Sequence, residues 1–203
     1  MIAVIDYGVG NLFSVEKAVA ALGADVKVTS DKETIEAAEK IILPGVGAFG
    51  DCMKNLEATG LIPTIKSLVA DGRPMLGICV GLQILFDGSE ESPGAKGLGL
   101  IHGMVKKINA PGLKIPHMGW NSLTIRESRE PRDLFHGLQE HPYVYFVHSY
   151  HAVPDDPAVI TATTEYGEQL TASVAVGNLQ ATQFHPEKSG DVGLSILKNF
   201  IEG

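Results

Sequence analysis

The first half of the chain alternates short apolar runs with longer segments in which apolar residues recur every three or four positions. The short runs, at residues 2–6, 26–29, 40–43 and 75–78, predict strands that are buried on both faces. The longer segments predict helices, and Gly23 and Gly72 stand where two of these helices should end. Because each strand then returns through a right-handed crossover, this alternation favours a parallel sheet.

The second half of the chain has a different pattern. It predicts strands over residues 97–108, 121–125, 143–152, 159–164 and 171–183, and the last of these contains a hairpin turn at Gly177-Asn178. Residues 89–96 are polar and rich in Gly and Pro, which indicates a loop, and an amphipathic helix closes the chain. No linker separates the two halves. We therefore expect one domain over residues 1–203: an α/β fold with a mostly parallel, flavodoxin-like central sheet flanked by helices, plus an antiparallel extension.

Charge and composition exclude several classes of protein. Lys and Arg number 16 against 24 Asp and Glu, a net charge of −8 that argues against a broad nucleic-acid or anionic-membrane surface. The chain starts without a basic leader segment, and no apolar run reaches the roughly 18 residues that span a bilayer. Two cysteines cannot build a disulfide scaffold. We expect a cytoplasmic protein that binds neither nucleic acid nor membrane.

The segment Gly77-Ile78-Cys79-Val80-Gly81 follows a predicted buried strand and precedes a predicted helix. A nucleophile on such a sharp turn needs very small residues two positions before and after it, since the backbone would otherwise collide. A thiolate at the start of a helix is stabilised by free N–H groups, and it can attack a carbonyl to form a thioester. Free cysteines are more often small buried hydrophobic residues, and this reading of Cys79 stays open.

A cysteine nucleophile needs a base, and His185 is the best candidate of the seven histidines because it closes a strand pattern. In extended chain Glu187 lies on the same side as His185 and can hold one ring nitrogen, which leaves the other for Cys79. His-Pro-Glu alone is also compatible with an ordinary surface turn.

The third strand is expected to break at Pro44-Gly45, and the loop that follows is rich in glycine. Gly45, Val46 and Gly47 could turn backbone N–H groups toward a ligand and form an oxyanion hole together with the N–H of Val80. An ordinary turn would look the same, and a phosphate loop is disfavoured because no Gly-Lys-Ser or Gly-Lys-Thr follows. Neither the histidines nor the cysteines have a ligand spacing that predicts a metal site.

Taken together, these motifs resemble the class I (triad) glutamine amidotransferases. Gly77-Ile78-Cys79-Val80-Gly81-Leu82-Gln83 and His185-Pro186-Glu187 carry the resemblance at the level of the class. The more specific likeness is to the glutaminase subunits of imidazole glycerol phosphate synthase. It extends over nearly the whole chain and is carried by residues 6–12, 44–50, 116–121 and 146–150.

This resemblance implies that glutamine is hydrolysed to glutamate and ammonia. Cys79 would then be the nucleophile, His185 the general base and acid, and Glu187 the residue that orients the imidazole. Gln83 and the backbone around Ser149 and Tyr150 would hold the glutamine. The residues implied to supply or gate the oxyanion hole are Gly45, Val46 and Gly47, together with Val80.

The resemblance also implies a partner and no cofactor. The partner would be a (β/α)8-barrel synthase subunit that forms a heterodimer with this chain, with Asn11 and Trp120 at or near the interface. Ammonia would pass into the barrel, which makes imidazole glycerol phosphate and an aminoimidazole carboxamide ribonucleotide in histidine biosynthesis. Two alternatives remain open: a stand-alone cysteine γ-glutamyl hydrolase, and a non-catalytic regulatory protein.

Overall fold

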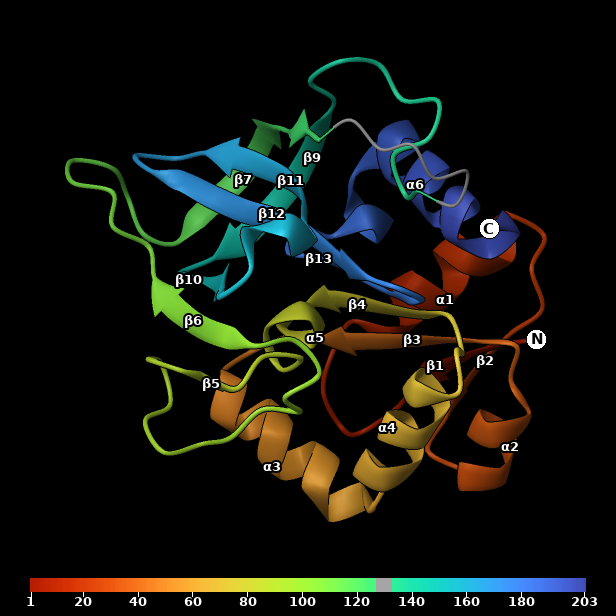
Figure 1. The fold of residues 1–203 in the computed structure, drawn as a ribbon. Coiled ribbons are helices and arrows are strands. Elements are labelled where there is room, and N and C mark those ends of the chain that lie inside the picture. Colours follow the sequence, from red (N-terminus) through yellow and green to blue (C-terminus); the bar gives the residue numbers. More distant parts are fainter. Residues whose placement is uncertain (127–132) are drawn as a thin grey trace.

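The computed structural model describes residues 1–126 and 133–203. An eight-stranded sheet crosses the molecule in the order β2-β1-β3-β4-β13-β12-β11-β8 (Figure 1). The first five strands are parallel and the remaining pairings are antiparallel. The strands are, in the same order, Val26–Thr29, Ile2–Ile5, Lys40–Gly45, Met75–Cys79, Leu179–Thr182, Gln169–Val176, Ile160–Glu165 and Thr124–Ile125.

Two helix layers cover the sheet (Figure 1). One layer holds α1 (Leu12–Ala21) and α6 (Gly190–Glu202), and the other holds α2 (Lys32–Ala37), α3 (Phe49–Thr59) and α4 (Ile62–Ala70). Every residue of β1 and β4 is buried, as expected of strands that lie between two helix layers. The parallel strands and the two layers confirm the predicted fold class.

Two small sheets extend the second half of the chain. β5 (Gly88–Ser89), β6 (Gly103–Lys107) and β10 (Tyr150–Pro154) form one sheet. β7 (His117–Ser122) and β9 (Tyr143–His148) form the other, an antiparallel pair. The Gly177-Asn178 turn joins β12 to β13 as predicted.

Three strand predictions were wrong in their bounds. Residues 97–102 are not a strand, because their backbone bonds to the segment after Cys79: Leu98 N donates to Ile84 O, and a Cβ on Gly97 would lie 2.0 Å from Phe86 O. The run at residues 143–152 is two strands, since the chain exchanges β7 for β6 as its partner at Ser149. The run at residues 121–125 is also divided, between β7 and β8.

The strand β3 does not break at Pro44-Gly45, which corrects the expectation for this segment. Pro44 and Gly45 stay in register with Ile78 and Cys79 of β4. A proline can sit there because β1 pairs with β3 only as far as Ile42, so no strand on that side needs an N–H from residue 44. The Pro44 carbonyl accepts a hydrogen bond from the buried Tyr7 hydroxyl at 2.6 Å. The extra length carries the glycine loop to the end of β4.

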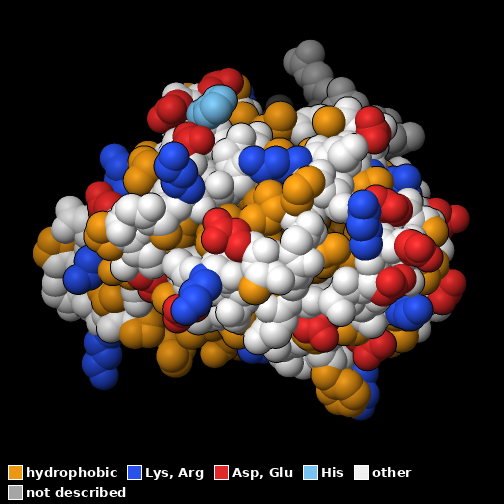
Figure 2. All heavy atoms as spheres, turned by 90° about the horizontal axis from the view of Figure 1, so that it is seen from below, with side chains coloured by type: hydrophobic (Ala, Val, Ile, Leu, Met, Phe, Trp, Pro, Cys, Tyr) orange, Lys and Arg blue, Asp and Glu red, His pale blue; other side chains and the backbone are white. Residues whose placement is uncertain are grey.

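The outer surface carries charges of both signs. On the face covered by α2, α3 and α4, Lys and Arg side chains are scattered among Asp and Glu side chains (Figure 2). Within residues 1–126 and 133–203, no helix is long and apolar enough to cross a membrane.

Candidate active site

Cys79 sits on a sharp bend between β4 and the short helix α5 (Val80–Gln83). Its backbone has φ 56° and ψ −112°, a region that residues with a Cβ rarely adopt. Backbone strain of this kind persists only where the surroundings hold it in place, and it concentrates at functional sites. The predicted turn at Cys79 is therefore present.

The glycines on either side of Cys79 make this bend possible. A Cβ on Gly77 would lie 2.9 Å from Gly81 O, and a Cβ on Gly81 would lie 1.9 Å from Leu43 O. Gly45 is equally restricted, because its Cβ would lie 2.8 Å from Gly81 N and 2.8 Å from the Tyr7 hydroxyl. Any side chain at these positions would push β3 and the bend apart.

His185 reaches the bend because β13 lies beside β4. The two strands are parallel, with Thr182 opposite Ile78, so the chain leaves β13 next to the point where it leaves β4. The Nδ1 atom of His185 lies 2.8 Å from Oε1 of Glu187, and both side chains are buried. The predicted pairing is present, although the segment Pro186–Lys188 is a 3-10 turn rather than extended chain.

The surroundings of His185 favour its protonated form. Burial alone would lower the pKa of this imidazole, but the neighbouring Cys79 and the hydrogen bond to Glu187 outweigh it and raise the pKa to about 9. The Nε2 atom is buried and makes no hydrogen bond with any described residue. His185 is thus suited to keep a proton that it takes from a neighbouring group.

Glu187→Gln should lower the pKa of His185, because it removes one of the groups that stabilise the imidazolium. The measurement is an NMR titration of the His185 ring in both proteins. We expect the wild-type ring to titrate near pH 9 and the variant ring at lower pH. Glu168→Gln is the matched control, since that carboxylate lies 3.7 Å from His151. An unchanged His185 titration in Glu187→Gln would contradict the assigned pairing.

Cys79 and His185 open into one cavity of about 300 Å³ at the carboxyl ends of the parallel strands. Open α/β sheets bind their ligands at this edge. Gly45 and Glu187 do not line it. The lining contains eight of the residues selected from the sequence: Val46, Gly47, Cys79, Val80, Gln83, Ser149, Tyr150 and His185.

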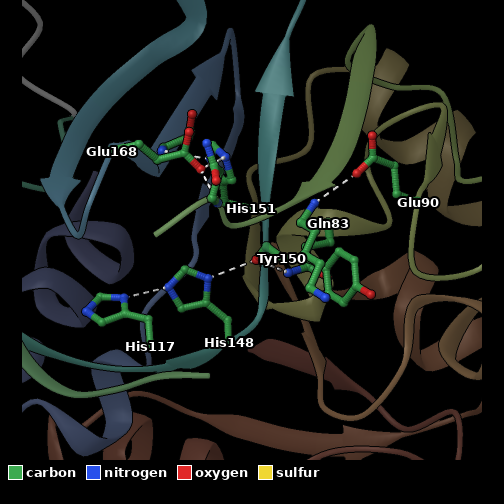
Figure 3. Close-up of polar contacts among 10 residues, drawn as sticks. Gln83, Glu90, His117, His148, Tyr150, His151 and Glu168 are labelled. Atoms are coloured by element: carbon green, nitrogen blue, oxygen red, sulfur yellow. Dashed lines mark hydrogen bonds and ion pairs between the residues drawn. The ribbon is translucent and has the colours of Figure 1, made fainter. Parts of the chain in front are cut away.

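Two buried glutamines connect Tyr150 with Cys79 through hydrogen bonds. Gln83 Nε2 donates to Tyr150 O at 3.0 Å and to Gln183 Oε1 at 3.1 Å, and Figure 3 shows Gln83 beside Tyr150. Gln183 in turn directs its Nε2 at Cys79 Sγ, 3.8 Å away. Gln183, which is fully buried two positions before His185, was not predicted from the sequence, because its burial is visible only in the structure.

Glu91 also lines the cavity and was missed, because the sequence indicated only a loop at residues 89–96. Its carboxylate accepts a hydrogen bond from Phe49 N at 2.9 Å. This bond ties the 89–96 loop to the start of α3, next to Val46 and Gly47.

The second cysteine has a different environment. Cys52 is fully buried in α3, and its Sγ donates weakly to Val46 O at 3.3 Å. Burial raises the pKa of its thiol to about 11, so that it stays protonated near neutral pH. It provides an internal reference for the reactivity of Cys79.

Asn11 and Trp120, the two residues implied to contact a partner, both lie near the cavity end of the sheet. Asn11 precedes α1 on the connection from β1, and Gly10 before it packs on Pro44. Trp120 on β7 is 56% exposed and lies close to Gly190, where α6 begins. No group of three or more His, Cys, Asp or Glu side chains in the described part of the chain could hold a metal ion.

Comparison with known proteins agrees with this geometry. The family model "Glutamine amidotransferase class-I" matches residues 3–203. Two solved structures share the fold: a glutamine amidotransferase (TM-score 0.77, 22% identity, 100% of this chain and 98% of that one) and PurLQS from Thermotoga maritima (TM-score 0.78, 22% identity, 99% and 97%). The chain therefore belongs to the class-I glutamine amidotransferase family.

More similar relatives narrow the assignment. The imidazole glycerol phosphate synthase subunit HisH of Methanothermobacter thermautotrophicus is 52% identical over 202 residues, with 100% of this chain and 98% of the relative covered. HisH of Thermosynechococcus vestitus is 50% identical over 202 residues, covering 98% and 95%. Within its family the chain groups with HisH, the glutaminase subunit of imidazole glycerol phosphate synthase.

Proposed function

We propose that this chain hydrolyses glutamine in the cavity between Cys79 and His185, and that a synthase partner consumes the ammonia. The observation that carries the proposal is the joining of a strained Cys79, a buried His185 with a raised pKa and a buried Glu187 at the same edge of the sheet. A nucleophile, a base and a group that orients the base are the parts that covalent amide hydrolysis requires.

In the first half of the reaction, the Cys79 sulfur attacks the side-chain amide carbon of glutamine. The thiol proton has already passed to Nε2 of His185, where the raised pKa favours holding it, and a C–S bond forms. His185 then gives this proton to the amide nitrogen as the C–N bond breaks. The products of this half are ammonia and a γ-glutamyl thioester on Cys79.

In the second half, a water molecule attacks the thioester carbon. His185 takes a proton from this water, the C–S bond breaks, and the proton returns to sulfur as glutamate leaves. Glu187 accepts a hydrogen bond from Nδ1 throughout, so that Nε2 always faces the reacting atoms.

The negative charge that develops on the amide oxygen needs hydrogen-bond donors. Val80 supplies the first backbone N–H after the nucleophile, and Val46 and Gly47 line the same cavity. Gly45 lets this loop approach the bend closely. We assign the oxyanion hole to Val80 and the Val46-Gly47 loop, and the binding of glutamine to Gln83, Ser149 and Tyr150.

The proposed partner is a (β/α)8-barrel subunit that forms a heterodimer with this chain in the cytoplasm. Trp120 on β7 and Asn11 before α1 are the proposed contacts, and they are supported by their position near the cavity end of the sheet. Ammonia released into water becomes protonated and is lost as a nucleophile, so hydrolysis is useful only when the partner is docked. The glycine loop can change its peptide orientation at low cost and could serve as the gate.

The test is glutaminase turnover of the chain alone, with the barrel partner, and with the partner plus its ribonucleotide ligand. We expect turnover to rise at least about tenfold from the first condition to the third, within the usual range of coupling between sites. Equal rates in all three conditions would exclude the gate and favour a stand-alone γ-glutamyl hydrolase. No hydrolysis in any condition would favour a non-catalytic regulatory protein.

A further inference from the structure

A row of hydrogen bonds leads from the strand β7 to the wall of the glutamine cavity. His117 and His148 lie directly opposite each other on β7 and β9, and Nδ1 of His117 is 2.9 Å from Nε2 of His148. The Nδ1 atom of His148 is 2.8 Å from Tyr150 O (Figure 3). At the other end, Asn121 Nδ2 lies 3.2 Å from Nε2 of His117. We call Asn121, His117 and His148 the histidine relay.

The two ends of the relay fix where its protons lie. Tyr150 O can only accept, so Nδ1 of His148 carries a hydrogen, and Nε2 of the neutral ring accepts. His117 must then donate from Nδ1 and accept at Nε2. The orientation of the Asn121 amide agrees with this assignment. Its Oδ1 accepts a hydrogen bond from Ser122 N, and its Nδ2 donates to Glu165 O. The atom that faces Nε2 of His117 is therefore the donor Nδ2.

An added proton cannot be accommodated in this row. It would have to sit on Nε2 of either ring, and there it would face another N–H. Burial agrees with neutral rings, since it lowers the pKa of His117 to about 4 and the pKa of His148 to about 3. His151 on β10 and His185 after β13 lie close enough to His148 to disfavour its protonation further.

Ring packing holds His117 in place. The rings of Phe146 and Tyr166 stack on it, with centroids 4.7 Å and 4.2 Å away. The ring therefore has little freedom to turn its nitrogens away from His148 and Asn121.

The relay ends on an atom of the cavity wall. Tyr150 O accepts from Nδ1 of His148 and from Nε2 of Gln83, which occupies both of its lone pairs. Tyr150 and Gln83 both line the cavity, and Gln83 lies on α5 directly after the Cys79 bend. The relay and Gln83 thus hold the same carbonyl of the cavity wall in place.

We propose that His117 and His148, kept neutral and protonated on Nδ1, are positioning residues that set the Tyr150 carbonyl and, through it, Gln83 for glutamine binding. His148 itself borders the cavity, whereas His117 does not, so the role of His117 in glutamine binding is indirect. This inference rests on the proposed glutaminase function, because the ligand whose binding it controls is glutamine. Loss of the relay should weaken glutamine binding and leave the chemical step nearly unchanged.

The main test compares three variants in the complex with the synthase partner. His117→Phe keeps a stacked ring but removes the donor to His148, and His117→Asn restores an N–H near the position of Nδ1. We expect His117→Phe to raise the glutamine KM by about tenfold, the usual effect of one lost buried hydrogen bond, with kcat within about twofold. His117→Asn should recover most of the loss. His102→Phe, at an exposed histidine, is the control and should leave KM unchanged.

Two results would overturn the inference: an unchanged KM in His117→Phe, or a loss confined to kcat. If the wild-type protein hydrolyses glutamine and Cys79→Ala does not, the proposed function holds even when the inference about the histidine relay fails. The failure of the inference can therefore be distinguished from the failure of the proposed function. Imidazole nitrogen NMR of the wild-type protein tests the relay without any substitution. The inference predicts that both rings carry their hydrogen on Nδ1 and do not titrate between pH 6 and 8. A hydrogen on Nε2 of either ring, or titration of either ring in this range, would overturn the inference.

Discussion

Cys79→Ala is expected to abolish glutamine hydrolysis, with turnover falling by at least about 10⁴-fold. Alanine removes the only atom that can form the γ-glutamyl bond, while its small side chain suits the confined bend at the end of β4. Ammonia-dependent synthesis by the complex with the partner should remain, because free ammonia bypasses the cavity. Glutamate release and product formation, measured on the same preparation with either nitrogen source, test both halves of this expectation.

Cys52→Ala is the matched control for this substitution. Cys52 is also buried, and its thiol lies against Val46 O beside the same loop, but it does not line the cavity. We expect this variant to retain hydrolysis within about tenfold of wild type, as is usual for residues outside the reacting set. If Cys79→Ala also lost ammonia-dependent synthesis, the division of labour between the two subunits would be wrong.

Gly81→Ala should damage both the fold and the activity. The new Cβ would lie 1.9 Å from Leu43 O, a backbone atom of β3 that cannot move without disturbing the sheet. We expect the free energy of unfolding to fall by at least about 3 kcal/mol. Turnover should fall by at least about a hundredfold, since displacement of the nucleophile by about 1 Å has effects of that size. Chemical denaturation and glutaminase assays measure the two effects.

Gly88→Ala is the corresponding control for stability. Its Cβ would meet the end of the flexible Met104 side chain at 3.3 Å, which can turn aside. If the Gly81→Ala variant were as stable and as active as the Gly88→Ala variant, the bend at Cys79 would not require glycine at position 81.

The bend at Cys79 could be predicted because its cause is local. Glycines two positions before and after a cysteine, between an apolar run and a helical pattern, describe a turn that few other residues could build. The pairing of His185 with Glu187 was equally accessible, since two residues separated by one proline stay within reach of each other in either backbone conformation.

Features that depend on strand pairing could not be predicted. That β13 lies beside β4, and so brings His185 to Cys79, follows from the whole sheet rather than from any segment. The same holds for the register that places His117 opposite His148. The strand predicted over residues 97–102 was wrong because Gly97 packs against a backbone carbonyl more than ten positions earlier in the chain.

The central claim is that the Cys79 sulfur is the atom that attacks glutamine. The most direct measurement is covalent trapping with a glutamine analogue that carries an electrophilic ketone in place of the amide, followed by peptide mass spectrometry with and without the barrel partner. We predict a single label on Cys79, formed faster with the partner, and none on Cys52, whose thiol stays protonated near neutral pH. A label on Cys52, or an unlabelled Cys79 while hydrolysis is blocked, would contradict the account.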